Sequence, residues 1–327
     1  MKSFEDEKEE TNSIVSPNAL ILFTSTWPSQ RTTNAVTLNK NGGECQNLVV
    51  TDRYSMRIPV NFKADKASYA RDAQVNDAAT EQASKSTWGT LCLPYPIKNN
   101  TNGVKFYWLQ STANNYMEFE EFGDNAIIPA NTPVLYSRTD GDVSSKINIV
   151  EANVNVPENA DYTPVIIDYA NPKKGTYPLE SASATLQDWE FRGNLKTNIF
   201  YGAHYVGTIE QNAQRVDNGD VYYFKQNKFT HLTPAMVKNG VRYEAGKMTI
   251  FPYRAYFYKK GVNGSPAKVS AYSILVVDEF GNTTDITNAV FGDGEGDGKI
   301  YDLNGIRVMQ PVKGRLYIVN GQKKVYR

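Results

Sequence analysis

Seven Asn-Gly pairs constrain the fold of this chain more than any other sequence feature. They lie at Asn41-Gly42, Asn102-Gly103, Asn218-Gly219, Asn239-Gly240, Asn263-Gly264, Asn304-Gly305 and Asn320-Gly321. The two central residues of a type I′ hairpin turn need positive φ, which Asn and Gly adopt at the lowest cost. Short runs rich in β-branched and aromatic residues flank many of these pairs, for example residues 104–109 and 221–224. The pattern predicts short strands joined by tight turns, and hence an all-β protein.

The aromatic content favours strands as well. The chain holds 21 Tyr, 14 Phe and 4 Trp but only 2 His, and aromatic side chains suit pleated, half-buried surfaces. Further strands are expected at residues 116–122, 247–251, 255–258 and 273–277. No apolar run repeats with a helical period over three turns. Residues 66–86 come nearest to a helix, but their Ala, Asp and Gln content predicts a polar loop.

We expect two antiparallel β-sandwich domains and a short C-terminal β-hairpin unit. A length of 327 residues allows two domains. The expected division is a disordered leader at 1–13, domains at 14–160 and 161–291, and a linker with hairpins at 292–327. Prolines cluster near the domain boundary, and an acidic glycine-rich stretch opens the last unit. Two hairpins cannot bury enough surface to be stable alone, so the last unit must dock on something.

Charge and hydropathy exclude two kinds of partner. Lys and Arg number 35, as do Asp and Glu, and no basic stripe of the kind that binds nucleic acid appears over most of the chain. No apolar run approaches the roughly 20 residues of a membrane span. The charged leader does not resemble a signal peptide. That fits either a cytoplasmic protein or a chain whose export segment was removed or lies upstream.

Residues able to carry out catalysis are sparse and poorly arranged. His204 and His231 are expected to be hydrogen-bonded or surface residues, and no zinc-ligand spacing or G-x-S-x-G turn occurs. Cys92 with His204 as a thiol and base is disfavoured, because Cys92 lies within an apolar strand. Cys45 and Cys92 are either two buried thiols or one disulfide, and the sequence leaves both open.

Two acidic clusters have simple structural explanations. Glu118, Glu120, Glu121 and Asp124 meet the spacing of a glycosidase pair, as alternating carboxylates on an outer strand face often do. Asp293, Glu295 and Asp297 resemble the start of an EF-hand loop, but Asn304 stands at its twelfth position, where Glu is needed. We therefore expect no catalytic residue, no metal site and no cofactor.

Aromatic side chains are the better functional candidates. Exposed rings stack on sugars or anchor protein partners. The candidate binding residues are Tyr107, Trp108, Trp189, Tyr253, Tyr256 and Tyr258. The alternative is that most of these rings form core or cross-strand pairs. Trp88 is expected to lie in the core.

Four segments resemble a known group of proteins. They are C-Q-N-L-V-V-T-D at 45–52, W-G-T-L-C-L-P-Y at 88–95, F-P-Y-R-A-Y-F at 251–257, and Y-D-L-N-G-I-R-V with K-G-R-L-Y-I-V-N-G-Q-K-K-V in the tail. They resemble segments of secreted surface β-proteins of the Bacteroidetes, and the tail is similar to the end of a C-terminal sorting domain. The resemblance implies a secreted, outer-membrane-associated surface protein, and it carries over no catalytic residue.

The sequence thus favours a non-enzymatic surface protein, an adhesin or structural binding module whose partner is a host or cell-surface glycan or protein. It would be held at the surface through its tail or through a signal absent from this sequence. A carbohydrate-binding accessory protein with aromatic platforms is the alternative. A hydrolase with an unrecognised active site is the third hypothesis.

Overall fold

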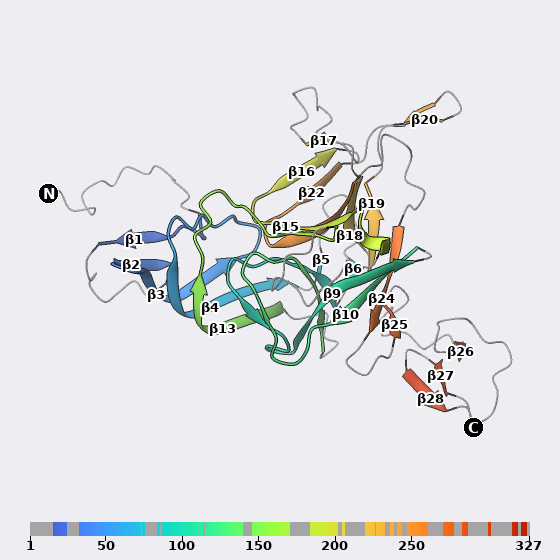
Figure 1. The fold of residues 1–327 in the computed structure, drawn as a ribbon, viewed down its shortest axis with the longest axis horizontal. Helices are drawn as coiled ribbons and strands as arrows, with labels where there is room; N and C mark the ends of the chain where they lie inside the picture. Colours follow the sequence, from blue (N-terminus) through green and yellow to red (C-terminus); the bar gives the residue numbers. More distant parts are fainter. Residues whose placement is uncertain are drawn as a thin grey trace.

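The computed structural model describes the chain in segments. These are residues 16–24, 33–72, 74–75, 84–85, 87–113, 115–139, 146–170, 184–201, 205–206, 220–225, 227–232, 236–238, 241–243, 247–260, 271–277, 283–286, 300–301, 316–319 and 322–325. Within them the regular secondary structure consists of strands and one short 3-10 turn, η1 (Ala184–Leu186), with no α-helix. The expected all-β fold is confirmed (Figure 1).

A five-stranded sheet lies toward the N-terminus. Its order is β1 (Ile21–Phe23), β2 (Ala35–Asn39), β3 (Gly42–Thr51), β4 (Phe62–Asp72) and β13 (Lys146–Val156). Strand β4 begins before the predicted polar loop at residues 66–86 and includes its first part. That prediction is wrong for residues 66–72, because small and polar residues here alternate between a buried and an exposed face. It is wrong also for residues 74–75 and 84–85, which pair as short strands.

A larger sheet contains strands from both halves of the sequence. Its order is β14 (Ile166–Asp168), β15 (Trp189–Asn194), β23 (Arg254–Lys259), β18 (Asp220–Lys225), β19 (Lys228–His231), β24 (Ala271–Val277), β10 (Tyr116–Glu121), β9 (Val104–Ala113), β12 (Val134–Arg138) and β7 (Trp88–Leu91), with β25 (Thr283–Asp285) paired to β24. The strands expected at 104–109, 116–122, 221–224, 255–258 and 273–277 are all among them.

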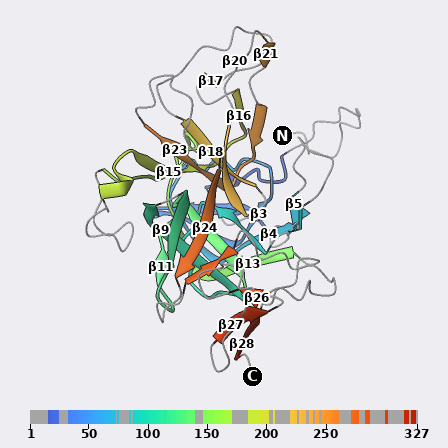
Figure 2. The ribbon, with the colours of Figure 1, turned by 90° about the vertical axis from the view of Figure 1, so that its right-hand side faces the viewer.

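Most strand pairs are antiparallel, as expected, but three are parallel: β1–β2, β3–β4 and β10–β24. The β10–β24 pair joins Tyr116 to Ser273, so the two halves of the sequence share one sheet. The expected division at residue 160 therefore does not separate two hydrogen-bonded sheets. Figure 2 shows β24 running alongside the strands of both halves.

Small sheets and ribbons complete the described structure. They are β8 (Ile97–Lys98) with β11 (Ile127–Ile128), β16 (Asn198–Tyr201) with β17 (Tyr205–Val206) and β22 (Lys247–Ile250), β20 (Met236–Lys238) with β21 (Val241–Tyr243), β5 (Gln74–Val75) with β6 (Ser84–Lys85), and β26 (Ile300–Tyr301) with β27 (Leu316–Val319) and β28 (Gln322–Val325). The β27–β28 hairpin is the second of the two expected in the C-terminal unit. The first was expected between residues 299–303 and 306–309, and most of these residues lie outside the described part of the chain. The acidic stretch 292–298 lies outside the described residues.

Two apolar clusters fill the interior. The main cluster draws side chains from the five-stranded sheet and from both halves of the larger sheet, among them Leu48, Ile149, Phe119 and Phe257. The second lies around Phe200, Tyr256 and Tyr258. Neighbouring residues of β23 enter different clusters, so this strand is buried on both faces, which explains its nearly continuous aromatic sequence.

No described helix is long and apolar enough to cross a membrane.

Candidate functional site

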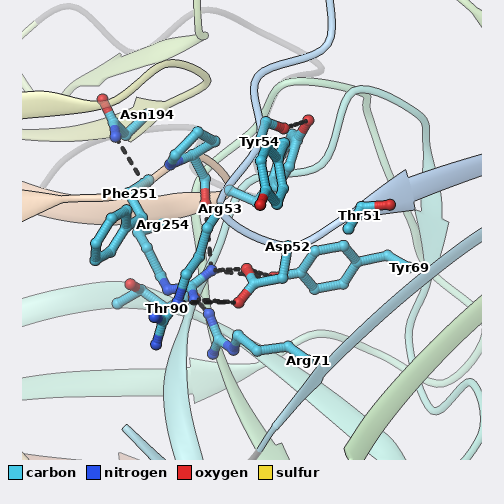
Figure 3. Close-up of polar contacts among 12 residues, drawn as sticks. Thr51, Asp52, Arg53, Tyr54, Tyr69, Arg71, Thr90, Asn194, Phe251 and Arg254 are labelled. Atoms are coloured by element: carbon cyan, nitrogen blue, oxygen red, sulfur yellow. Dashed lines mark hydrogen bonds and ion pairs between the residues drawn. The ribbon is translucent and has the colours of Figure 1, made fainter. Parts of the chain in front are cut away.

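A partly buried ion pair joins the two sheets and forms the centre of a cluster of polar side chains (Figure 3). Asp52 follows strand β3, and Arg254 is the first residue of β23. Arg254 donates from Nη1 to Asp52 Oδ1 at 2.7 Å and from Nη2 to Oδ2 at 2.9 Å. Both side chains are about one-fifth exposed, at 19% and 21%. This two-pronged geometry is the strongest that an arginine and a carboxylate can form.

Tyr69 of β4 completes the environment of the carboxylate. Its hydroxyl donates to Asp52 Oδ1 at 2.6 Å and accepts from Arg254 Nη1 at 3.0 Å. Burial raises the pKa of Tyr69 to about 12, so the hydroxyl stays protonated and remains a donor. Burial alone would raise the pKa of Asp52, but the hydrogen bonds and charge of Arg254, with Arg71 and Tyr69, hold it below its usual value. Asp52 is therefore a fixed anion.

A second arginine extends the network toward strand β12. Arg71 donates to the Tyr136 hydroxyl, and its guanidinium lies 5.0 Å from the centre of the Tyr136 ring. It also donates to the Thr90 carbonyl at 3.3 Å. Gly89 makes room for this pair, because a Cβ there would lie 2.7 Å from the Tyr136 hydroxyl and 2.8 Å from Arg71 Nη2. The glycine of the W-G-T-L-C segment is thus required by packing.

The same segment closes the larger sheet on itself. Thr90 Oγ1 of β7 donates to the Ala255 carbonyl and accepts from the Ala255 N–H, both at 3.0 Å. Two residues further on, Cys92 packs so closely on Gly193 that a Cβ at Gly193 would lie 2.3 Å from its sulfur. The Thr90 side chain therefore satisfies both backbone groups of Ala255, although β7 and β23 are not neighbours in the sheet order.

Tyr253 ties the β22–β23 turn to the end of β3. Its backbone has φ +66°, a costly conformation for a bulky residue. Its hydroxyl donates to the Tyr54 carbonyl at 2.7 Å and accepts from Asn18 Nδ2 at 3.0 Å. Asn18, itself buried, also pairs with the Thr51 backbone in both directions. We call Asn18, Asp52, Tyr69, Arg71, Tyr136, Tyr253 and Arg254 the Asp52 network.

The groups of the Asp52 network are suited to holding the strands together rather than to catalysis. Its carboxylate is ionised and held by three donors, and its tyrosines are held protonated or paired with arginine. Neither Asp52 nor Tyr69 is poised to exchange a proton near neutral pH, since the pKa of each is displaced away from 7. Three of the four motif segments meet here, through Asp52, Thr90 and Arg254.

The predicted aromatic binding residues do not form a surface. Tyr107, Trp108, Trp189, Tyr253, Tyr256 and Tyr258 are all buried, none more than 7% exposed. The expectation that they are exposed is therefore wrong, because both faces of the larger sheet are covered where these residues lie. The open alternative, that the rings are core and cross-strand pairs, describes them. Trp88, expected in the core, is half-buried and packs against Tyr107 at 5.1 Å between ring centres.

The structure does not bring these six rings together. Trp189 belongs to an inner aromatic cluster with Tyr222, Phe257 and Tyr272. Tyr256 packs on Phe200 on the other face of the sheet.

The remaining candidate groups are separated or committed to partners. Glu121 is buried and binds Lys105 at 2.8 Å, whereas Glu118 accepts from Ser111 at 3.0 Å on the opposite face of β10. Burial, with the neighbouring charge of Glu118, raises the pKa of Glu120. No group of three His, Cys, Asp or Glu in the described part of the chain is arranged to hold a metal. His204 and residues 293–297 lie outside that part.

His231 and both cysteines are buried. His231 Nε2 lies 3.3 Å from Asp220 Oδ2, across the β18–β19 pair. Cys45 and Cys92 are free thiols, so the structure favours two buried thiols over a disulfide. Burial raises the pKa of each thiol, which makes both poor nucleophiles.

Sequence reasoning missed two charged clusters. The first is the Asp52–Arg254 pair, whose partners lie 202 positions apart. The second joins Lys260 to Asp168 at 2.7 Å and to Glu190 at 3.4 Å, and Arg192 binds Glu190 at 2.6 Å. One sequence signal could have indicated both clusters. A charged residue at the end of an apolar run, or inside one, needs a partner of opposite charge once it is buried.

Comparisons with protein-family models, curated proteins and solved structures give no match. Fold and site together define an all-β protein whose sheets contain both parallel and antiparallel strand pairs and whose interior contains ion pairs between strands.

Proposed function

We propose that this chain is a non-enzymatic binding protein, an adhesin or structural module that contacts a glycan or protein at a cell surface. One observation carries the proposal: the three motif segments contact one another through Asp52–Arg254 and Thr90–Ala255. The most distinctive residues of the sequence, those of the motif segments, thus stabilise the fold. Groups that would otherwise suggest chemistry, including Cys92 and Asp52, are committed to packing or pairing.

Secretion and attachment to the outer surface belong to the same proposal. They rest on the resemblance of the motif segments and of the C-terminal tail to secreted surface proteins. The tail segments at 300–308 and 313–325 are the ones that resemble the end of a sorting domain, and their basic residues include Arg307, Lys313, Lys323 and Lys324. Localisation of the full-length gene product in surface-exposed and cytosolic fractions tests this part. Recovery in the cytosol alone contradicts it.

A carbohydrate-binding role is the second candidate, and one observation favours it. The predicted aromatic platforms are buried, but Tyr54 is 50% exposed and follows Arg53, whose guanidinium lies 5.0 Å from the centre of the Phe251 ring. A ring and a planar cation in one loop suit the apolar and polar faces of a sugar.

The test is a binding screen of the purified full chain against a glycan array and a panel of extracellular-matrix proteins. The proposal predicts saturable binding to a member of one panel and the release of that ligand unchanged. A heat-unfolded sample of the same chain is the control for nonspecific adsorption. Turnover of a polysaccharide, or an absence of saturable binding in both panels, overturns the proposal.

A further inference from the structure

The loop Asp52–Arg57, between β3 and β4, places two positive charges and an aromatic ring at the surface. Arg53, Tyr54 and Arg57 are exposed. Asp52 is the only acidic residue of this loop, and Arg254 binds both of its carboxylate oxygens. Arg53 lies farther from that carboxylate, with its Nε 3.9 Å from Oδ2. The loop therefore presents a local positive charge although the chain as a whole has none.

Arg53 is held in place before any ligand arrives. Its backbone has φ +68°, and its guanidinium lies over the Phe251 ring at 5.0 Å from the ring centre. Its side chain nevertheless remains 46% exposed. A guanidinium held over a ring in this way loses less conformational freedom when its N–H edge binds a carboxylate. The Tyr253 bond to the Tyr54 carbonyl anchors the next residue of the loop.

The small number of exposed residues in this loop, Arg53, Tyr54 and Arg57, favours a glycan over a protein as the ligand. Two arginines and one tyrosine within five positions span at most about 17 Å of extended chain. A stable protein interface takes about 20–30 residues on each partner, far more than these three exposed side chains. One aromatic face beside arginine edges instead suits sugar rings that carry acidic groups.

We propose that the Asp52–Arg57 loop binds the carboxylate groups of an acidic polysaccharide, with Arg53 and Arg57 on the carboxylates and Tyr54 on a sugar ring. This inference rests on the proposed binding function and names the class of ligand for it. Carboxylate is the preferred anion because the guanidinium edge matches its two oxygens.

The test uses the full chain and three probes: polygalacturonate, neutral dextran and dextran sulfate. Wild type should bind polygalacturonate and not dextran, with affinity falling as salt is raised. The variant Arg53→Gln/Arg57→Gln should bind polygalacturonate at least about tenfold more weakly, because it loses two charge-assisted contacts. Tyr54→Ala should weaken binding about threefold or more, which is the smaller effect expected of one lost ring contact.

The control variant is Lys63→Ala/Lys66→Ala, which removes the same charge from exposed positions on β4. Its affinity should match wild type, and melting curves should show that all variants are folded. Equal losses in the lysine and arginine variants, or tighter binding of dextran sulfate than of polygalacturonate, overturn the proposal. If the chain binds another partner in the screen but not polygalacturonate, the loop assignment fails and the binding function stands. If it binds nothing, both fail.

Discussion

Asp52 keeps its charge inside the protein because Arg254 contacts both of its oxygens and Tyr69 donates a third hydrogen bond. Removing one partner of such a pair leaves the other desolvated and uncompensated. Tyr253 and Arg53, both in the left-handed backbone region, flank this pair. The cost of their backbone conformations is offset by the contacts they make, the Tyr253 hydroxyl with Tyr54 and the Arg53 guanidinium with Phe251.

The first residue-scale prediction concerns acid stability. The pKa of Asp52 is lower in the folded protein than in the unfolded chain, so unfolding takes up a proton once the pH reaches the unfolded value of about 4. This contribution to stability is complete above that pH and is lost as the pH falls toward the folded pKa. Asp52→Asn should cost about 2–4 kcal/mol at pH 7. Urea unfolding across pH 2–7 should show a shallower acid loss for the variant, whereas parallel curves would contradict the assignment.

The second concerns the contact between Cys92 and Gly193. A Cβ on Gly193 would lie 2.3 Å from the Cys92 sulfur, so Gly193→Ala should destabilise the protein by about 1–3 kcal/mol. Cys92→Ala removes the sulfur, and the double variant should be more stable than the sum of the two single effects predicts. Thermal melts of the four proteins measure this coupling. Additive losses would show that the two residues are not in contact.

At the scale of elements, the turn at Asn102-Gly103 gives the clearest link from sequence to structure. The other fully described Asn-Gly pair, Asn41-Gly42, departs from the predicted type I′ turn, because Asn41 does not have positive φ and the β2–β3 hairpin pairs Asn39 with Gly42. Asn102 and Gly103 have φ +49° and +72°, the signs a type I′ turn requires, and the Val104 N–H donates to the Thr101 carbonyl at 2.9 Å.

Gly103→Ala should therefore cost about 1 kcal/mol, because alanine adopts positive φ poorly. The matched control is Gly123→Ala, where a Cβ would meet nothing within 4 Å and φ is not positive. That substitution should be neutral or slightly stabilising. Denaturant midpoints of the two variants provide the comparison, and equal midpoints would contradict the turn assignment.

Strand positions could be predicted from sequence, but strand partners could not. Turn residues and β-branched or aromatic runs located the strands at 104–109 and 273–277 because these signals are local. The parallel pairing of β10 with β24 depends on contacts across more than 150 residues, for which no local pattern exists. Residues 66–72 were missed because their small and polar residues weaken the alternation. The aromatic candidates failed because ring content alone does not distinguish a buried face from an exposed one.

At the scale of the molecule, the two sheets share one apolar core and are joined by the Asp52 network and by the Arg71 hydrogen bond to the Thr90 carbonyl. In this arrangement the Asp52–Arg57 loop is anchored to the core by the Asp52–Arg254 pair and by the Tyr253 bond to the Tyr54 carbonyl. The motif residues could be recognised in the sequence, but their meeting point could not, since Asp52, Thr90 and Arg254 are far apart along the chain.

The central claim is that the two halves of the sequence share one hydrophobic core and fold as a single unit. Hydrogen exchange of the full chain in increasing urea, read by mass spectrometry, tests it most directly. Peptides covering β9 and β12 should lose protection at the same urea concentration as peptides covering β15 and β23, because both sets depend on one core. Loss of protection in two steps, with the break near residue 160, would instead show two separately folded halves and contradict the claim.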